Sequence, residues 1–437
     1  MNSADSRPTA TASIGAWSAG ALVAGNMIGA GVFTTSGFAL ADLGSRSSVL
    51  LAWVVGGLIA LCGAWSYVRL ASALPGNGGE YLFLSRSVHP LAGFLAGWVS
   101  LLAGFTAPIA VAAHGLEAYV SASFDIPWPS GLLGATAIVA AGLAHGVARH
   151  SGLRIQNVAV GVQVAAILAF IVLGGFAIPD LLPEIGASES VQPGKSVSIS
   201  AFAVTLIWVS FSYSGWNAAI YVADEMRDPR RTLMPATLIG TAGVVVLYVL
   251  LNAVFVYSAP IELLSGHAEV GAIAAEALGG VNARRAISVV VALGLGTSIS
   301  AMVMVGPRIF AKMADDGVLP SVLRSGAAPP RAAIALQVGL ALFAFFMAEL
   351  RDLLLYVGFL LGLSAAGTVA CLFVVARDQR GDQQRPSRLH PWLPLIFICA
   401  TLASAGFLIV SEPVQAVAGL GTLGLGAAIY WATSRAR

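Results

Sequence analysis

The chain has 437 residues, of which 10% are charged and 57% are apolar, and its mean hydropathy is +0.85. Soluble domains carry about 25% charged residues, so this composition excludes an ordinary water-soluble protein and indicates a helical membrane protein, in which glycine and proline are tolerated. The net charge is +2 and the three cysteines lie inside apolar stretches, which excludes a disulfide framework or a CxxC metal site in the connectors.

Apolar runs of about 18 residues or more, bounded by charged residues or by Pro and Gly, predict twelve transmembrane helices. In chain order the predicted spans lie near 14–41, 48–72, 90–120, 131–148, 154–178, 199–224, 233–258, 282–313, 332–348, 353–376, 391–410 and 413–433. Two connectors have a distinct composition: 75–89 predicts a short interfacial helix, and the polar segment 179–198 predicts a solvated loop.

Lysine and arginine predict the orientation. With the N-terminus inside, all but five of the 23 lie on the cytoplasmic side, and the five on the outer side are Arg46, Lys195, Arg284, Arg285 and Arg351. The positive-inside rule therefore predicts that both termini are cytoplasmic.

The first and sixth predicted spans contain residues that disfavour a continuous helix. The first has three glycines and one amide between Gly25 and Phe33, and the sixth has the small and polar run from Phe211 to Asn217. Each interior glycine costs about 1 kcal/mol relative to alanine, so both segments are predicted to unwind. Gly25 and Gly29 also form a GxxxG motif, and simple helix packing stays open as an alternative.

The first repeat has five spans, an odd number, so the sixth span enters the membrane from the face opposite to the first. Two inverted repeats that each begin with a broken helix are typical of secondary transporters. Free N–H groups near Gly29, Ala30 and Gly31 would bind a carboxylate, while carbonyls near Met27, Ile28, Phe211 and Tyr213 would accept from an ammonium. The pattern therefore predicts a zwitterionic amino acid as substrate.

Four segments, in order and with matching spacing, resemble the amino acid-polyamine-organocation (APC) superfamily, closest to its L-type and cationic amino acid transporter branch. They are MIGAGVF at 27–33, GGEY at 78–81, FSYSGWN at 211–217 with the charged turn 221–231, and RIF at 308–310 with DGVLP at 316–320. The family forms of the first three are I-I-G-S-G-I-F, S-G-G-E-Y and F-A-Y-G-G-W-N.

The resemblance implies an all-α LeuT-like fold and a secondary active amino acid permease that works by alternating access. The expected parts are a cytoplasmic tail at 1–13, inverted repeats at 14–178 and 199–376, and peripheral helices at 391–433. The expected substrate-binding residues are Met27, Ile28, Gly29, Ala30, Gly31, Phe211, Tyr213, Ser214, Gly215, Trp216 and Asn217. Phe211 would close over the substrate side chain, and Asn217 would stabilise the second break.

Three departures from the family pattern bear on function. Ala30 replaces a serine, and Ser214 replaces a glycine that faces the side-chain pocket, which predicts a narrower pocket for smaller neutral L-amino acids. Gln163 stands where many relatives have a lysine that substitutes for a sodium ion, so the coupling ion, H⁺ or Na⁺, stays open. The candidates for ion coupling are Gln163, Thr297, Ser298 and Ser300, although the three hydroxyls could equally bond carbonyls of their own helix.

The sequence fits other functions less well than transport. The sequence has no HExxH or GxSxG motif, which speaks against a membrane-embedded enzyme, and no cofactor or resident metal is expected. A cationic amino acid, polyamine or amine substrate and a membrane-embedded substrate sensor remain alternatives. The one-turn pair His114 and Glu117 is interpreted as a hydrogen-bonded histidine and a solvated acid rather than a proton relay.

Partners and location follow from the same segments. Animal L-type light chains pair with a glycoprotein through a cysteine in the loop after the third span, and the corresponding loop here, 121–130, has none. No disulfide-linked heavy subunit and no nucleic acid are therefore expected, and the composition suits a bacterial inner membrane. The charged residues Asp224, Glu225, Arg227, Arg230 and Arg231 are expected to form a cytoplasmic cluster beside the inner gate.

Overall fold

A computed structural model shows an all-helical chain. It describes residues 15–74, 79–124, 128–147, 152–188, 198–221, 223, 226, 228–315, 317, 319–324, 330–378 and 389–434, and every regular element in these ranges is a helix. The predicted tail 1–13 lies outside the described part, and so does most of the charged cluster (Asp224, Glu225, Arg227 and the side chain of Arg230). Arg231 of that cluster is described, and it pairs with Asp228 at 3.5 Å.

Each of the twelve predicted spans coincides with helical structure. In chain order these are α1 (Ala16–Met27) with α2 (Ala30–Leu43), α3 (Arg46–Ala73), α5 (Pro90–Val99) continued by the π-helix η1 (Ser100–Thr106) and α6 (Ala107–Ser123), α7 (Leu132–Val147), α8 (Gly152–Ser188), α9 (Ile199–Ser212) with α10 (Ala218–Tyr221), α11 (Pro229–Tyr257), α13 (Val270–Asp315), α14 (Arg331–Met347), α15 (Leu350–Asp378), α16 (Trp392–Ser411) and α17 (Pro413–Ser434). Within the described ranges, eight helices are long and apolar enough to cross a membrane, and the α1–α2 pair, bent by 46°, makes a ninth. The chain is therefore a multi-pass membrane protein.

Three short helices occupy connectors: α4 (Gly79–Ser87), α12 (Ile261–Leu264) and the 3-10 helix η3 (Ser321–Leu323). The helix predicted within 75–89 is confirmed by α4. Two boundaries differ from expectation. The predicted loop at 179–198 is wrong for its first part, because α8 continues to Ser188; Leu181 and Ile185 keep the four-residue spacing of apolar positions in a helix despite the polar neighbours.

The second difference concerns α13, which begins twelve residues before the predicted eighth span. Its backbone leaves helical geometry at Gly279 and Gly280, where φ of Gly280 is 71°. The predicted span 282–313 corresponds to the part after this kink. The earlier part, with α12, fills the connection that follows α11.

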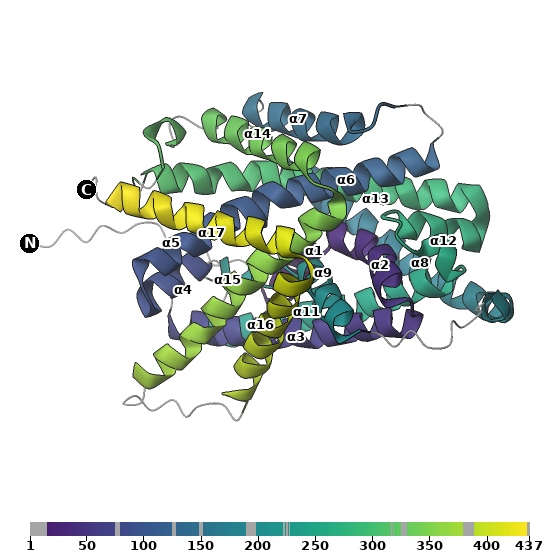
Figure 1. Cartoon of the computed structure of the whole chain (residues 1–437), viewed down its shortest axis with the longest axis horizontal. Helices are drawn as coiled ribbons and strands as arrows, with labels where there is room; N and C mark the ends of the chain where they lie inside the picture. Colours follow the sequence, from purple (N-terminus) through teal and green to yellow (C-terminus); the bar gives the residue numbers. More distant parts are fainter. Residues whose placement is uncertain are drawn as a thin grey trace, which may run out of the picture.

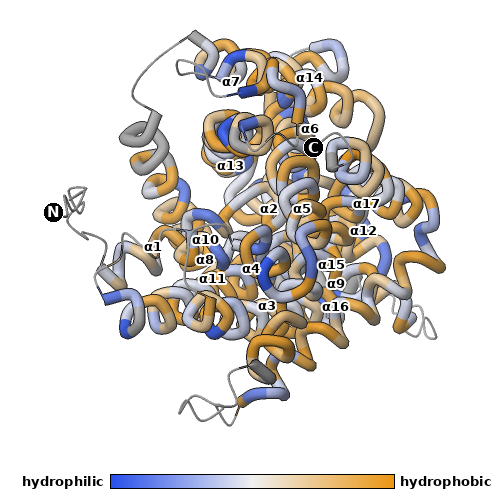
Figure 2. The backbone as a smooth tube through the Cα atoms, turned by 90° about the vertical axis from the view of Figure 1, so that its left-hand side faces the viewer, coloured by the Kyte–Doolittle hydropathy of each residue, from blue (hydrophilic) through white to orange (hydrophobic). Residues whose placement is uncertain are grey.

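The helices form one bundle, and different short helices lie at its two ends (Figure 1). The helix α4 and the C-terminal end of α17 lie at one end, on the left, and α12 lies at the other. The end-on view shows α7 and α14 together at the edge and α4 facing the viewer (Figure 2). Within the bundle, α9 packs against α2, α3, α15 and α16, while α11 packs against α1 and α3. The two interrupted spans are thus enclosed by other helices, which places both breaks in the protein interior.

Candidate functional site

The first interruption is short and uncapped. Helix α1 ends at Met27 and α2 begins at Ala30, while Ile28 (φ −75°, ψ 100°) and Gly29 (φ −143°, ψ −162°) are extended. Gly29, the residue before α2, has no side chain that could cap the helix. The first N–H groups of α2 have no intrahelical acceptor, and they carry the positive end of the helix dipole.

The second interruption spans five residues. Helix α9 ends at Ser212, residues 213–217 form successive turns, and α10 resumes at Ala218. Gly215 has φ +109°, a conformation that a side chain would strain. The turn is held by backbone hydrogen bonds from Ser214 N to Phe211 O (2.9 Å) and from Ala218 N to Gly215 O (3.1 Å). Both sequence-predicted breaks are therefore present, the first narrower than the glycine cluster suggested.

The two breaks lie against each other. The amide of Asn26 donates to Gly215 O at 3.1 Å, and a Cβ built on Gly215 would lie 2.8 Å from Asn26 O. On the other side, the hydroxyls of Thr35 and Ser212 are 3.1 Å apart. A Cβ on Gly31 would lie 2.8 Å from the Cα of Ser212, so α2 and the end of α9 touch at backbone distance.

Helix α11 supports the first break. The Tyr248 hydroxyl donates to Met27 O at 2.6 Å, and the Tyr213 hydroxyl donates to Trp53 O at 3.0 Å. The rings of Tyr213 and Tyr248 pack on Trp53 with centroids 5.6 and 5.7 Å away. Tyr248 thus occupies one lone pair of a carbonyl that the sequence assigned to the substrate ammonium, and no sequence signal identified this tyrosine.

The predicted binding residues divide into two groups by their contacts. Around the breaks, Met27, Ile28, Ala30, Gly31 and Tyr213 are buried, while Gly29, Phe211, Ser214 and Gly215 are half-buried. Trp216 instead packs edge-on against Tyr67 at 4.6 Å and Phe397 at 6.2 Å, and Asn217 donates to Glu80 of α4 at 2.8 Å. The structure therefore joins the second break to α3, α16 and α4 as well as to the first.

The ion-coupling candidates make protein contacts. Gln163 is buried, and a Cβ on Gly294 would lie 2.5 Å from its Cδ, so its amide packs on the backbone of α13. Thr297 and Ser298 donate to Gly294 O at 2.8 and 3.0 Å, which is the intrahelical bonding that the sequence left open. Ser300 lies on another face of α13, where its hydroxyl is 2.8 Å from His145 Nε2.

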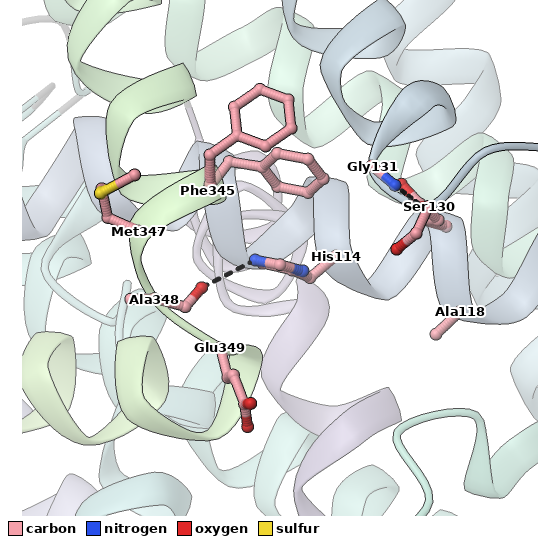
Figure 3. Close-up of a pocket in the computed structure, with 10 residues that line it drawn as sticks. His114, Ala118, Ser130, Gly131, Phe345, Met347, Ala348 and Glu349 are labelled. Atoms are coloured by element: carbon pink, nitrogen blue, oxygen red, sulfur yellow. Dashed lines mark hydrogen bonds between the residues drawn. The ribbon is translucent and has the colours of Figure 1, made fainter.

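A separate cavity of about 470 Å³ lies between the end of α6, the start of α7 and the α14–α15 connection (Figure 3). His114 Nε2 is 3.1 Å from Ala348 O, in agreement with a hydrogen-bonded histidine. Glu117, by contrast, accepts from Gly131 N at 2.5 Å and Gly134 N at 3.0 Å. The expectation of a solvated acid omits this role: Glu117 is half-buried, and its carboxylate caps the N-terminus of α7.

Metal binding finds no support in the described ranges, where no three His, Cys, Asp or Glu side chains are grouped to hold an ion. The described cysteines are also unpaired: Cys62 and Cys371 are buried, and Cys399 is exposed.

Comparison with known proteins adds a family to this geometry. A family model described as amino acid permease matches residues 14–428. The human large neutral amino acids transporter small subunit 2 is 29% identical over 96% of this chain and 79% of its own. The mouse Asc-type amino acid transporter 1 is 27% identical over 94% and 78%, and the mouse b(0,+)-type amino acid transporter 1 is 26% identical over 90% and 81%.

Proposed function

The chain belongs to the amino acid permease family, and from that premise we propose that it carries small neutral L-amino acids across the cell membrane by alternating access. One observation carries the proposal: the uncapped start of α2 lies beside the second break, within a bundle that encloses both. Such a break offers N–H donors and carbonyl acceptors to the two charged groups that all amino acids share.

The substrate carboxylate would bind the N–H groups of Gly29, Ala30 and Gly31. Its ammonium would bind the carbonyls of Ile28 and Phe211, together with the remaining lone pair of Met27 O. Gly29 favours this arrangement because a Cβ at this position would meet no heavy atom within 4 Å, which leaves open space beside the break. Phe211, which is half-buried, would close over the substrate.

Substrate size is proposed from Ser214, which follows Phe211 in the turn and is half-buried. A hydroxymethyl group there would narrow the pocket relative to glycine. A relative is named for large neutral amino acids, so the preference for alanine, serine or threonine is the part of the proposal that most needs a direct test.

The proposed arrangement in the membrane follows the two breaks. Residues 14–178 and 199–376 would form inverted repeats, with 391–433 peripheral, both termini cytoplasmic, and α4 on the cytoplasmic side. We propose that no heavy subunit is attached by a disulfide, although relatives include a protein named as a small subunit. In Na⁺ coupling, the hydroxyl oxygens of Thr297 and Ser298 would bind the ion through their lone pairs while their hydrogens stay bonded to Gly294 O.

Counterflow in proteoliposomes tests the function. Proteoliposomes that contain the purified protein and unlabelled alanine should accumulate labelled alanine from outside. External alanine, serine or threonine should inhibit this uptake more strongly than leucine or phenylalanine. The matched variant Ser214→Gly should raise the relative competition by leucine and phenylalanine. A wild-type preference for leucine or phenylalanine would refute the size assignment, and response only to polyamines or other amines would refute the substrate class. Binding without counterflow would support a sensor.

A further inference from the structure

Glu80, the second residue of α4, joins that helix to the second half of the sixth span. Its Oε1 accepts from Asn217 Nδ2 at 2.8 Å, and its Oε2 accepts a short hydrogen bond from the Tyr221 hydroxyl. The backbone is equally close, since a Cβ on Gly79, where φ is +49°, would lie 3.0 Å from Tyr221 Cζ. The start of α4 is therefore fitted to α10 by both hydrogen bonds and contact.

The donors to Glu80 among the described residues are the neutral Asn217 amide and Tyr221 hydroxyl. From α3, the Tyr67 ring packs edge-on against Phe83 of α4, with the centroids 6.4 Å apart. The α5 sequence, which packs on α4, has no titratable side chain, and His89 before it caps Leu91 N. At the far end of α4 lie Arg86 and Ser87. On α15, which also packs on α4, the Cys371 thiol donates to Gly367 O.

Among the described residues, no cation forms an ion pair with Glu80. Asp224, Glu225 and Arg227, farther along the sixth span, lie outside the described residues. Within the described part of the chain, the hydrogen bonds to Glu80 thus come from a segment on the far side of a helix break.

Protonation would change this junction directly. An ionised carboxylate only accepts hydrogen bonds, whereas a carboxyl group must donate one. A neutral carboxyl group can donate from one oxygen to the Tyr221 hydroxyl, which rotates to accept, while its other oxygen still accepts from the Asn217 amide. Both hydrogen bonds then lose the strength that the negative charge gives them. The Tyr221 side chain lies at the protein surface.

We propose that Glu80 is a proton-binding site that controls the cycle: its ionised carboxylate holds α10 to α4 by two charge-assisted hydrogen bonds, and uptake of one proton from solution weakens both. The inference rests on the proposed transport function and adds a regulating ligand, the proton. Helix α10, which is four residues long, also packs on α1, α3 and α11, so the proposed change loosens the α4–α10 junction and does not free the whole helix. Transport should therefore be faster at lower pH.

The test is alanine counterflow measured from pH 4.5 to pH 8.5, with equal pH on both sides of the membrane. Glu80→Gln cannot ionise, so its rate should vary less than twofold over a range in which the wild-type rate changes severalfold. Glu80→Asp should keep a pH dependence. Tyr221→Phe removes one donor to the anion but keeps the ring, so its profile should move to higher pH. Glu349→Gln, which removes an exposed acid elsewhere, should keep the wild-type profile.

A wild-type protein that shows counterflow without pH dependence would overturn the proton site alone, whereas absence of counterflow at every pH would overturn the transport function. A wild-type profile in Glu80→Gln would also overturn the proton site. If Glu80→Gln does not fold, Tyr221→Phe decides, because an unshifted midpoint in that variant refutes the role of the Glu80 junction.

Discussion

Two glycines of the first break have different physical roles although they are two residues apart. A side chain on Gly29 would enter open space, whereas a Cβ on Gly31 would meet Ser212 at its Cα, Cβ and Oγ. The sequence indicated for both that the backbone N–H groups must be approachable, and it left helix packing open for Gly29, which the open space there does not support. The structure assigns Gly31 a second requirement, which is close packing of α2 on the end of α9.

Gly31→Ala should therefore destabilise the protein even without substrate. Forcing a methyl group into a packed contact costs about 1–3 kcal/mol, and here the obstacle is backbone as well as a hydroxyl. We expect a lower apparent melting temperature in detergent and weaker alanine binding. The matched variant Gly29→Ala should keep the wild-type melting temperature and lose affinity only. Equal melting temperatures for the two variants would show that the α2–α9 contact yields easily.

The N-terminus of α7 depends on a side chain from another helix. Glu117 of α6 accepts from the N–H groups of Gly131 and Gly134, across a connector that neither helix includes. A carboxylate at a helix N-terminus both satisfies free donors and complements the dipole. Glu117 is therefore a tertiary cap that positions α7 against α6.

Glu117→Ala should loosen the first turn of α7 and destabilise the protein by about 1–2 kcal/mol, the upper range for loss of an N-cap. Hydrogen exchange at the amides of 131–135 should become faster, with smaller changes near the middle of the helix. Glu349→Ala removes a second acid from the same cavity without removing a cap, and it should leave that exchange unchanged. Equal effects of both variants would indicate a general charge effect instead.

At the level of elements, the sequence patterns predicted which helices exist better than they predicted where each helix ends or which residues it contacts. Apolar length located every span because a helix must cross about 30 Å of hydrocarbon. The extension of α8 to Ser188 was missed, since polar residues of a helix that leaves the apolar layer resemble those of a loop. The Glu117 cap joins residues 14 positions apart, and the Glu80 junction joins residues 137 positions apart. Only the packed structure specifies such pairs, although the glycine and polar interruptions located the breaks.

On the scale of the whole molecule, one arginine connects helices from different parts of the chain. Arg351, at the start of α15, is 3.2 Å from Asp42 of α2 and 3.0 Å from Glu412, which lies between α16 and α17. Its guanidinium also lies over the Trp208 ring of α9, 5.2 Å from the centroid. The first half of the sixth span and the second half of the first are thus tied to the later helices at one point.

Arg351→Gln should weaken this junction more than loss of an exposed ion pair would. Asp42 and Glu412 are only 24% and 22% exposed, so removal of their shared cation leaves two partly desolvated carboxylates together. We expect a loss of about 1–3 kcal/mol, between the values for exposed and buried pairs, measured as a lower apparent melting temperature. Arg231→Gln breaks a pair whose side chains are 88% and 51% exposed and should change it little. If the two variants melt alike, Arg351 contributes no more than a surface charge. A lower melting temperature that Asp42→Asn restores in the Arg351→Gln background would instead establish that repulsion between the unpaired carboxylates drives the loss.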